Sequence, residues 1–119
     1  MYKRQIQEHA GHLLNLEWLW FARFNDILNG SPLLTEADLT NQATYDATYN
    51  DQNIENILDA FEEVRTQLIL LLRSIKTADL NKNANHPRLN TPMTIIDLAF
   101  FVAEHDDHHL AMIQYLSTQ

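Results

Sequence analysis

The 119-residue chain contains no cysteine, which excludes disulfide bonds, thiolate metal sites and a nucleophilic thiol of its own. Any thiol that takes part in its chemistry must therefore come from a ligand. Glycine and proline are also rare, with 2 and 3 residues, and this scarcity argues against collagen-like and low-complexity proteins. Together with a hydrophobic fraction of 45%, the composition indicates a helical globular protein.

Basic residues are scarce, and long apolar runs are missing. The chain has only 8 Lys and Arg against 16 Asp and Glu, which gives a formal net charge of −8. Such a balance cannot build a phosphate-neutralising surface, so nucleic acid and anionic membranes are excluded as partners. No run approaches the roughly 18 apolar residues of a membrane span, and the N-terminus lacks the apolar core of a signal peptide. We therefore expect a cytoplasmic protein.

Apolar residues recur at intervals of three and four positions in three long segments, and this period predicts amphipathic helices. The predicted helices cover residues 3–28, 51–76 and 95–116. A chain of 119 residues is long enough for one core but not for two. We therefore expect a single domain over residues 1–119 with an all-α fold, an antiparallel helix bundle.

Two polar segments connect these helices. Residues 31–49 are rich in Thr, Asn and Asp, which predicts an irregular crossing with one short turn near residues 35–38. A loop of this length is uncommon in a compact domain unless it covers something. Residues 77–93 lead into the capping-box sequence Thr94 to Asp97, which predicts the start of the third helix.

Three of the six histidines lie close together in the last predicted helix, in the sequence Glu104-His105-Asp106-Asp107-His108-His109. Residues four apart differ by only about 40° around a helix axis, so His105 and His109 share one face. That face is apolar, because it also carries Leu98, Val102 and Leu116. Two imidazoles at this spacing can bind one metal ion. The alternative is a pair of neutral core histidines, each satisfied by hydrogen bonds.

Charged and titratable residues also fall on the apolar faces of the other two predicted helices. Glu17 lies in the first and Arg65 in the second, and a lone buried charge is too costly to persist. We expect the two to pair or to support a metal site. For Arg65 the alternative is a buried stem with its guanidinium in water. His9 lies near the centre of the first apolar face, and His12 lies at its edge.

With His12, Glu17, Trp20 and Arg23 in the first predicted helix and His105-x-x-His108-His109 in the last, the chain resembles the DinB-like (YfiT-like) family of metal-binding four-helix bundles. The resemblance runs along nearly the whole chain. It also includes the crossing loop from Asn41 to Asn50 and the sequence His86-Pro87-Arg88 before the last helix.

The resemblance implies a divalent metal ion, Zn²⁺ or Ni²⁺, held by His12, His105 and His109. His9 is the alternative to His12, because it lies nearer the centre of the inward face. The implied activity is that of a metal-dependent hydrolase or of an S-transferase that uses a low-molecular-weight thiol. The alternatives are a metal- or ligand-binding protein without turnover and a purely structural dimeric bundle. Three further side chains are candidates to support the site: Glu17, Asp106 and His108.

The chain departs from the family pattern in two places. Family members usually carry a further helix before the one with the first ligand histidine, and many have glutamine where this chain has Met112. With only three long helices we expect a homodimer that completes the bundle. Its partner would cover an apolar groove, and Trp18 would add contact area. The groove is predicted to be lined by Leu13, Phe24, Phe61 and Leu68.

Overall fold

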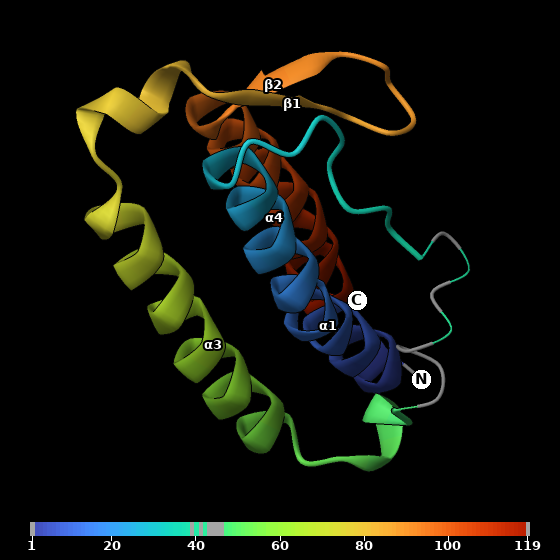
Figure 1. The fold of residues 1–119 in the computed structure, drawn as a ribbon. Helices are drawn as coiled ribbons and strands as arrows, with labels where there is room; N and C mark the ends of the chain where they lie inside the picture. Colours follow the sequence, from blue (N-terminus) through green and yellow to red (C-terminus); the bar gives the residue numbers. More distant parts are fainter. Residues whose placement is uncertain (1, 39, 41, 43–46, 119) are drawn as a thin grey trace.

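The computed structural model describes residues 2–38, 40, 42 and 47–118. It contains three long helices, as predicted, labelled α1, α3 and α4 in Figure 1. Helix α1 spans Tyr2–Leu28, α3 spans Ile54–Ser74 and α4 spans Ile95–Ser117. None of the described helices combines the length and the apolar character needed to cross a membrane.

The helix predicted for residues 51–76 is shorter at both ends. Asn53 caps α3, because its side-chain Oδ1 accepts a hydrogen bond from the backbone N–H of Glu55 at 2.8 Å. The preceding residues Tyr49–Asp51 form a separate 3₁₀ turn. At the other end the backbone of Ile75 is extended, with φ −69° and ψ 133°, which ends the helix. By contrast, α4 begins at the predicted capping box, where Thr94 Oγ1 accepts from the backbone N–H of Asp97.

Helix α1 is the centre of the molecule. It packs against both α3 and α4, while α3 and α4 contact each other far less over the described residues. Figure 1 shows that α1 and α3 run in the same direction and that only α4 runs opposite to them. The expectation of an antiparallel bundle is therefore wrong for the first two helices. The cause is the long connection between them: its described start lies beside Asn85, near the end of α1, and its described end packs on Gly11, in the first half of α1.

The core lies between α1 and its two neighbours, α3 and α4. It includes most of the residues that were predicted to line an uncovered groove. Leu13, Phe24 and Leu68 are only 5%, 0% and 2% exposed, and Phe61 is half-buried. The groove was therefore predicted on the wrong residues, because the helices of the same chain already cover most of this surface. Several of the large exposed apolar side chains lie instead on α4.

A small β-hairpin that the sequence did not predict closes one end of the bundle (Figure 1). Strand β1 spans Asn83–Asn85 and pairs antiparallel with β2, which spans Pro92–Thr94. Leu33 adds a parallel bridge to Asn85, so the start of the crossing loop is attached to the hairpin. Strands of three residues are too short to show a period-two pattern, which is why they were missed. The loop of the hairpin carries His86-Pro87-Arg88.

The crossing loop is irregular where the structure describes it. The predicted short turn near residues 35–38 is not present as a helical turn. Instead, Asp26 Oδ2 accepts hydrogen bonds from the backbone N–H of Thr35 at 2.6 Å and from its hydroxyl at 2.7 Å. Much of the segment from Asn41 to Asn50, which the family resemblance identified as the crossing, lies outside the described residues.

At its far end the loop is fixed to α1 by Tyr49. A Cβ atom on Gly11 would overlap the Tyr49 ring, so the glycine is what lets this ring pack against the helix. The Tyr49 hydroxyl also donates a hydrogen bond to the side chain of Asn15. This contact attaches the loop to the turn of α1 that contains His12.

Candidate metal centre

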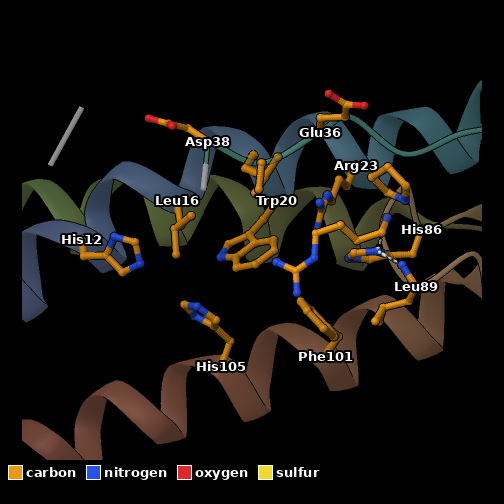
Figure 2. Close-up of a pocket in the computed structure, with 14 residues that line it drawn as sticks. His12, Leu16, Trp20, Arg23, Glu36, Asp38, His86, Leu89, Phe101 and His105 are labelled. Atoms are coloured by element: carbon orange, nitrogen blue, oxygen red, sulfur yellow. Dashed lines mark hydrogen bonds between the residues drawn. The ribbon is translucent and has the colours of Figure 1, made fainter. Parts of the chain in front are cut away.

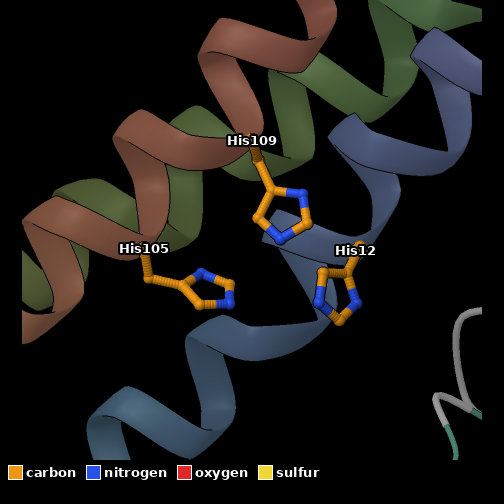
Figure 3. A group of neighbouring side chains, drawn as sticks. All are labelled: His12, His105 and His109. Carbon is orange, nitrogen blue, oxygen red and sulfur yellow. The ribbon is translucent and has the colours of Figure 1, made fainter.

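His12, His105 and His109 converge where α1 packs against α4 (Figure 3). One ring nitrogen from each lies within 4.8 Å of the others. The ring centroids of His105 and His109 are 4.7 Å apart, and that of His12 is 4.8 Å from His109 and 5.9 Å from His105. The four-residue spacing on α4 stacks two of the rings, and the facing turn of α1 supplies the third.

All three imidazoles are held in the neutral form. Burial is the largest cause, and it lowers the pKa of His12, His105 and His109. For His109 the neighbouring histidines lower it further, and its pKa falls to about 3. A neutral imidazole is the form that binds a metal ion, so at neutral pH no proton competes for these nitrogens.

The donor set fits a divalent ion. Nδ1 of His105 is buried and has no hydrogen-bond partner among the described residues, and a buried polar atom in this state costs about 1–3 kcal/mol. An ion that accepts the lone pair of a ring nitrogen is one species that satisfies such an atom. Imidazole suits Zn²⁺ and Ni²⁺. Three protein ligands with a further open position are typical of catalytic rather than structural zinc.

His9, the alternative to His12, lies outside this group of three and contacts one of its members. Its Nδ1 is 2.9 Å from Nδ1 of His109, a hydrogen bond in which one of the two nitrogens carries the proton. This contact occupies Nδ1 of His109 and leaves Nε2 available for an ion. A hydrogen bond to the second nitrogen of a ligand histidine fixes the orientation and tautomer of the ring.

A charged network lies beside the histidines and joins all three long helices. Arg65 of α3 donates from Nε to Glu17 of α1 at 3.0 Å and from Nη1 to Asp106 of α4 at 2.7 Å. The predicted pairing of Glu17 with Arg65 is thus confirmed, and Asp106 extends it to the third helix. Both carboxylates are buried, at 2% and 9% exposed. Arg65 stays charged, because although burial lowers its pKa, the hydrogen bonds to the two acids raise it above its ordinary value.

The three candidate supporting groups therefore divide into two kinds. Glu17 and Asp106 are bonded to Arg65, and each retains one buried oxygen without a partner among the described residues. Burial raises the pKa of Glu17, and Arg65 offsets only part of this effect. His108 is exposed, and its ring meets that of His109 edge-on with centroids 5.5 Å apart. Of the three, His108 alone combines exposure to water with a contact to a candidate ligand.

A cavity of about 530 Å³ opens beside the histidines (Figure 2), within the size range of small-molecule sites. His12 and His105 line one end, and apolar side chains that include Trp20 and Phe101 line the middle. The opposite end, in Figure 2, carries Arg23 and His86. The candidate ion position is therefore adjacent to a space that can hold a small molecule.

The chain matches the DinB superfamily over residues 2–113. It belongs to the DinB superfamily. A similar solved structure is that of YfiT from Bacillus subtilis, described as a probable metal-dependent hydrolase with an unusual four-helix bundle topology. The two align with a TM-score of 0.79 and 21% sequence identity, over 95% of this chain and 65% of that chain. The likeness establishes a common fold. The chain spans less than two thirds of the length of YfiT. No curated protein matches this chain significantly.

Sequence reasoning did not identify the far end of the cavity in this DinB-superfamily chain. Arg23 and His86 entered only as part of the family resemblance, with no role attached. A signal was present for Arg23, because residues 12, 16 and 23 share one edge of the first helix, and all three positions line the cavity. For His86 there was no such signal, since its place depends on the hairpin.

Proposed function

We propose that this member of the DinB superfamily is a divalent-metal-dependent enzyme in which His12, His105 and His109 hold the ion. The observation that carries the proposal is the meeting of three neutral imidazoles within 4.8 Å, with two of them lining a cavity of about 530 Å³. Zn²⁺ or Ni²⁺ fits this donor set. The description of YfiT as a probable metal-dependent hydrolase supports the same chemistry.

When bound, such an ion lowers the pKa of a water molecule or a thiol. Water would make the protein a hydrolase, and a low-molecular-weight thiol would make it an S-transferase. The chain has no cysteine, so the thiol must be a second substrate. Trp20 and Phe101 make the middle of the cavity apolar, and the exposed imidazole of His108 lies beside His109.

Metal analysis of the purified protein tests the ion. We expect close to one Zn²⁺ or Ni²⁺ per chain, lost in His105→Ala and His109→Ala. The matched control is His108→Ala, which removes an adjacent histidine that lies outside the group of three and should retain the ion. Equal metal content in His108→Ala and His105→Ala, or a wild-type protein that binds no divalent ion, would contradict the proposal.

Turnover separates an enzyme from a metal-binding protein without activity. Metal-loaded protein is incubated with activated esters and amides in one series, and with low-molecular-weight thiols and electrophiles in another. Product that depends on both the ion and His12 supports catalysis. Product from the esters or amides would indicate a hydrolase, and product from the thiols and electrophiles would indicate an S-transferase. Metal binding without product in either series would favour the non-catalytic alternative.

We also propose that the chain forms a homodimer through the outer face of α4. Ile96, Phe100 and Leu110 are 62%, 65% and 53% exposed, and they lie within about 80° of one another around the helix. Exposed apolar side chains along one side of a helix can form part of an interface. Light scattering at micromolar concentration should give a dimer that Phe100→Asp converts to a monomer, and a wild-type monomer would refute this proposal.

A further inference from the structure

The cavity end away from the histidines carries two arginines that form no ion pair among the described residues. Arg23 is only 2% exposed, and its Nε donates to the backbone carbonyl of Thr35 at 2.9 Å. Among the described residues no carboxylate forms an ion pair with Arg23 or with Arg88, the second arginine that lines the cavity. Burial lowers the pKa of Arg23, and the charge of Asp26 offsets only part of this effect. A buried guanidinium without an anionic partner is unfavourable. The two arginines therefore leave a place for an anion.

His86 adds a hydrogen-bond donor at the same end. Its Nδ1 accepts from the backbone N–H groups of Arg88 and Leu89, both at 3.1 Å. Because Nδ1 is an acceptor, the proton of the neutral ring must be on Nε2. Burial lowers the pKa of His86, and the charges of Arg23 and Arg88 lower it further, so the ring stays neutral. His86 is buried and lines the cavity, where it can donate from Nε2–H.

The rest of the cavity limits which anion fits. Leu16, Trp20 and Phe101 make the middle apolar. Glu36 and Asp38 lie at the edge, and in Figure 2 their carboxylates point away from the other labelled side chains. Two acidic groups at the edge disfavour a doubly charged phosphate more than a singly charged carboxylate. A planar carboxylate also matches the fork of an arginine.

We propose that the cavity binds a small monocarboxylate with an apolar body. The carboxylate is held by Arg23, Arg88 and Nε2–H of His86, and the body lies between Trp20 and Phe101. The other end of the molecule reaches His12 and His105. The inference rests on the proposed function only for this last point, because the carboxylate site itself requires no ion.

Binding of 3-phenylpropionate and its neutral analogue 3-phenylpropanamide tests the charge requirement. Isothermal titration calorimetry is performed on the full chain after EDTA treatment and again after Zn²⁺ loading. In the metal-free protein we expect the acid to bind at least about tenfold more tightly than the amide, the difference typical of a hydrogen bond to a charged group. Equal affinities of acid and amide, or no binding of either, would overturn the proposal.

Three arginine variants test the location. Arg88→Gln and Arg23→Gln should each weaken the acid about tenfold and leave the amide unchanged. Arg73→Gln is the matched control, because it removes the same charge from an exposed position in the last turn of α3 and should change neither ligand. Because Arg23 is buried, the affinities of Arg23→Gln are interpreted only if its circular dichroism spectrum is native. Arg88 is exposed, so Arg88→Gln tests the site even if Arg23→Gln does not fold. Loss of affinity in Arg73→Gln equal to that in Arg88→Gln would also overturn the proposal.

The two states of the protein separate this inference from the proposed function. Selective binding of the acid to metal-free protein, in a chain that takes up no ion, would leave the carboxylate site standing and remove the enzyme proposal. Binding of the acid only after Zn²⁺ loading would place the carboxylate on the ion and overturn the carboxylate site, while the metal centre would stand.

Discussion

Two polar groups lie side by side between the helices, the Arg65 network and the half-buried histidine group, and they differ in the charges that they contain. The Arg65 network contains opposite charges, so its members bond to one another. The histidine group contains like rings, and beside the effect of burial His105 lowers the pKa of His12 while His105 and His12 lower that of His109. Each neutral imidazole keeps one ring nitrogen with a lone pair, so three that converge can bind a cation from outside. We infer that the first group serves folding and the second serves binding.

Of the changes considered, substitution of Arg65 should have the largest effect on stability, because it breaks the Arg65 network. Arg65→Met leaves Glu17 and Asp106 buried without their partner, and breaking a buried ion pair in this way costs about 3–5 kcal/mol of unfolding free energy. Urea denaturation measures the change. Arg73→Met makes the same substitution at an exposed position of α3 and should alter stability by less than about 0.5 kcal/mol. Similar losses in both variants would contradict a structural role for the network.

Zn²⁺ should raise the unfolding free energy of the protein by binding to His12, His105 and His109. At a free Zn²⁺ concentration about 100 times its dissociation constant, the wild type should gain about 2.7 kcal/mol. His109→Ala should gain almost nothing, whereas Arg65→Met, if folded, should retain most of the gain, because its histidines are intact. Denaturation with and without Zn²⁺ provides the measurement. A gain in His109→Ala equal to that of the wild type would place the ion elsewhere.

Acid should weaken the metal-free protein through the histidines. Five histidines have a folded-state pKa below the ordinary 6.5: His9, His12, His86, His105 and His109. Below pH 6.5 the unfolded chain therefore binds more protons than the folded chain, and stability falls by about 1.4 kcal/mol per pH unit for each excess proton. The raised pKa of Glu17 has the opposite effect on stability in acid, but it concerns one group, whereas five histidines act in the other direction. Denaturation midpoints in EDTA that stay constant from pH 7.5 to pH 5 would contradict this expectation.

Loss of the histidine contact outside the group of three should have the smallest effect. His9→Ala removes the hydrogen bond to His109 without removing a ligand, so metal affinity should fall by about tenfold rather than disappear. Competition with a chelator of known affinity measures the change, with His108→Ala as the control. A complete loss of binding would show that His9 is itself a ligand and that the expected set of three is wrong.

The features that could be predicted from the sequence are those that depend on a single helix. The period of apolar residues located three helices, and the spacing of His105 and His109 placed both on the inward face. The cost of a lone charge predicted the pair of Glu17 and Arg65, although it did not reveal Asp106. That carboxylate follows His105 directly, and only the crossing of α3 against the other helices brings Arg65 to it.

Features that depend on long-range pairing were not predictable in the same way. The contact of His9 with His109 joins residues 100 positions apart. The hairpin that carries His86 has strands too short to show a pattern. The direction of α3 depends on a connection whose path is set by tertiary contacts, such as the bridge between Leu33 and Asn85, rather than by its own composition.

The packing of Tyr49 on Gly11 makes the crossing loop and the first histidine mechanically dependent on each other. Gly11 immediately precedes His12, and the Tyr49 ring occupies the space that any larger residue 11 would need. The ring therefore packs directly against the helix turn that carries His12. A single added methyl group, as in Gly11→Ala, would act as a wedge at the same point. The position of the Tyr49 ring and that of the helix turn before His12 are therefore coupled, and Gly11, which has no side chain, makes the coupling possible.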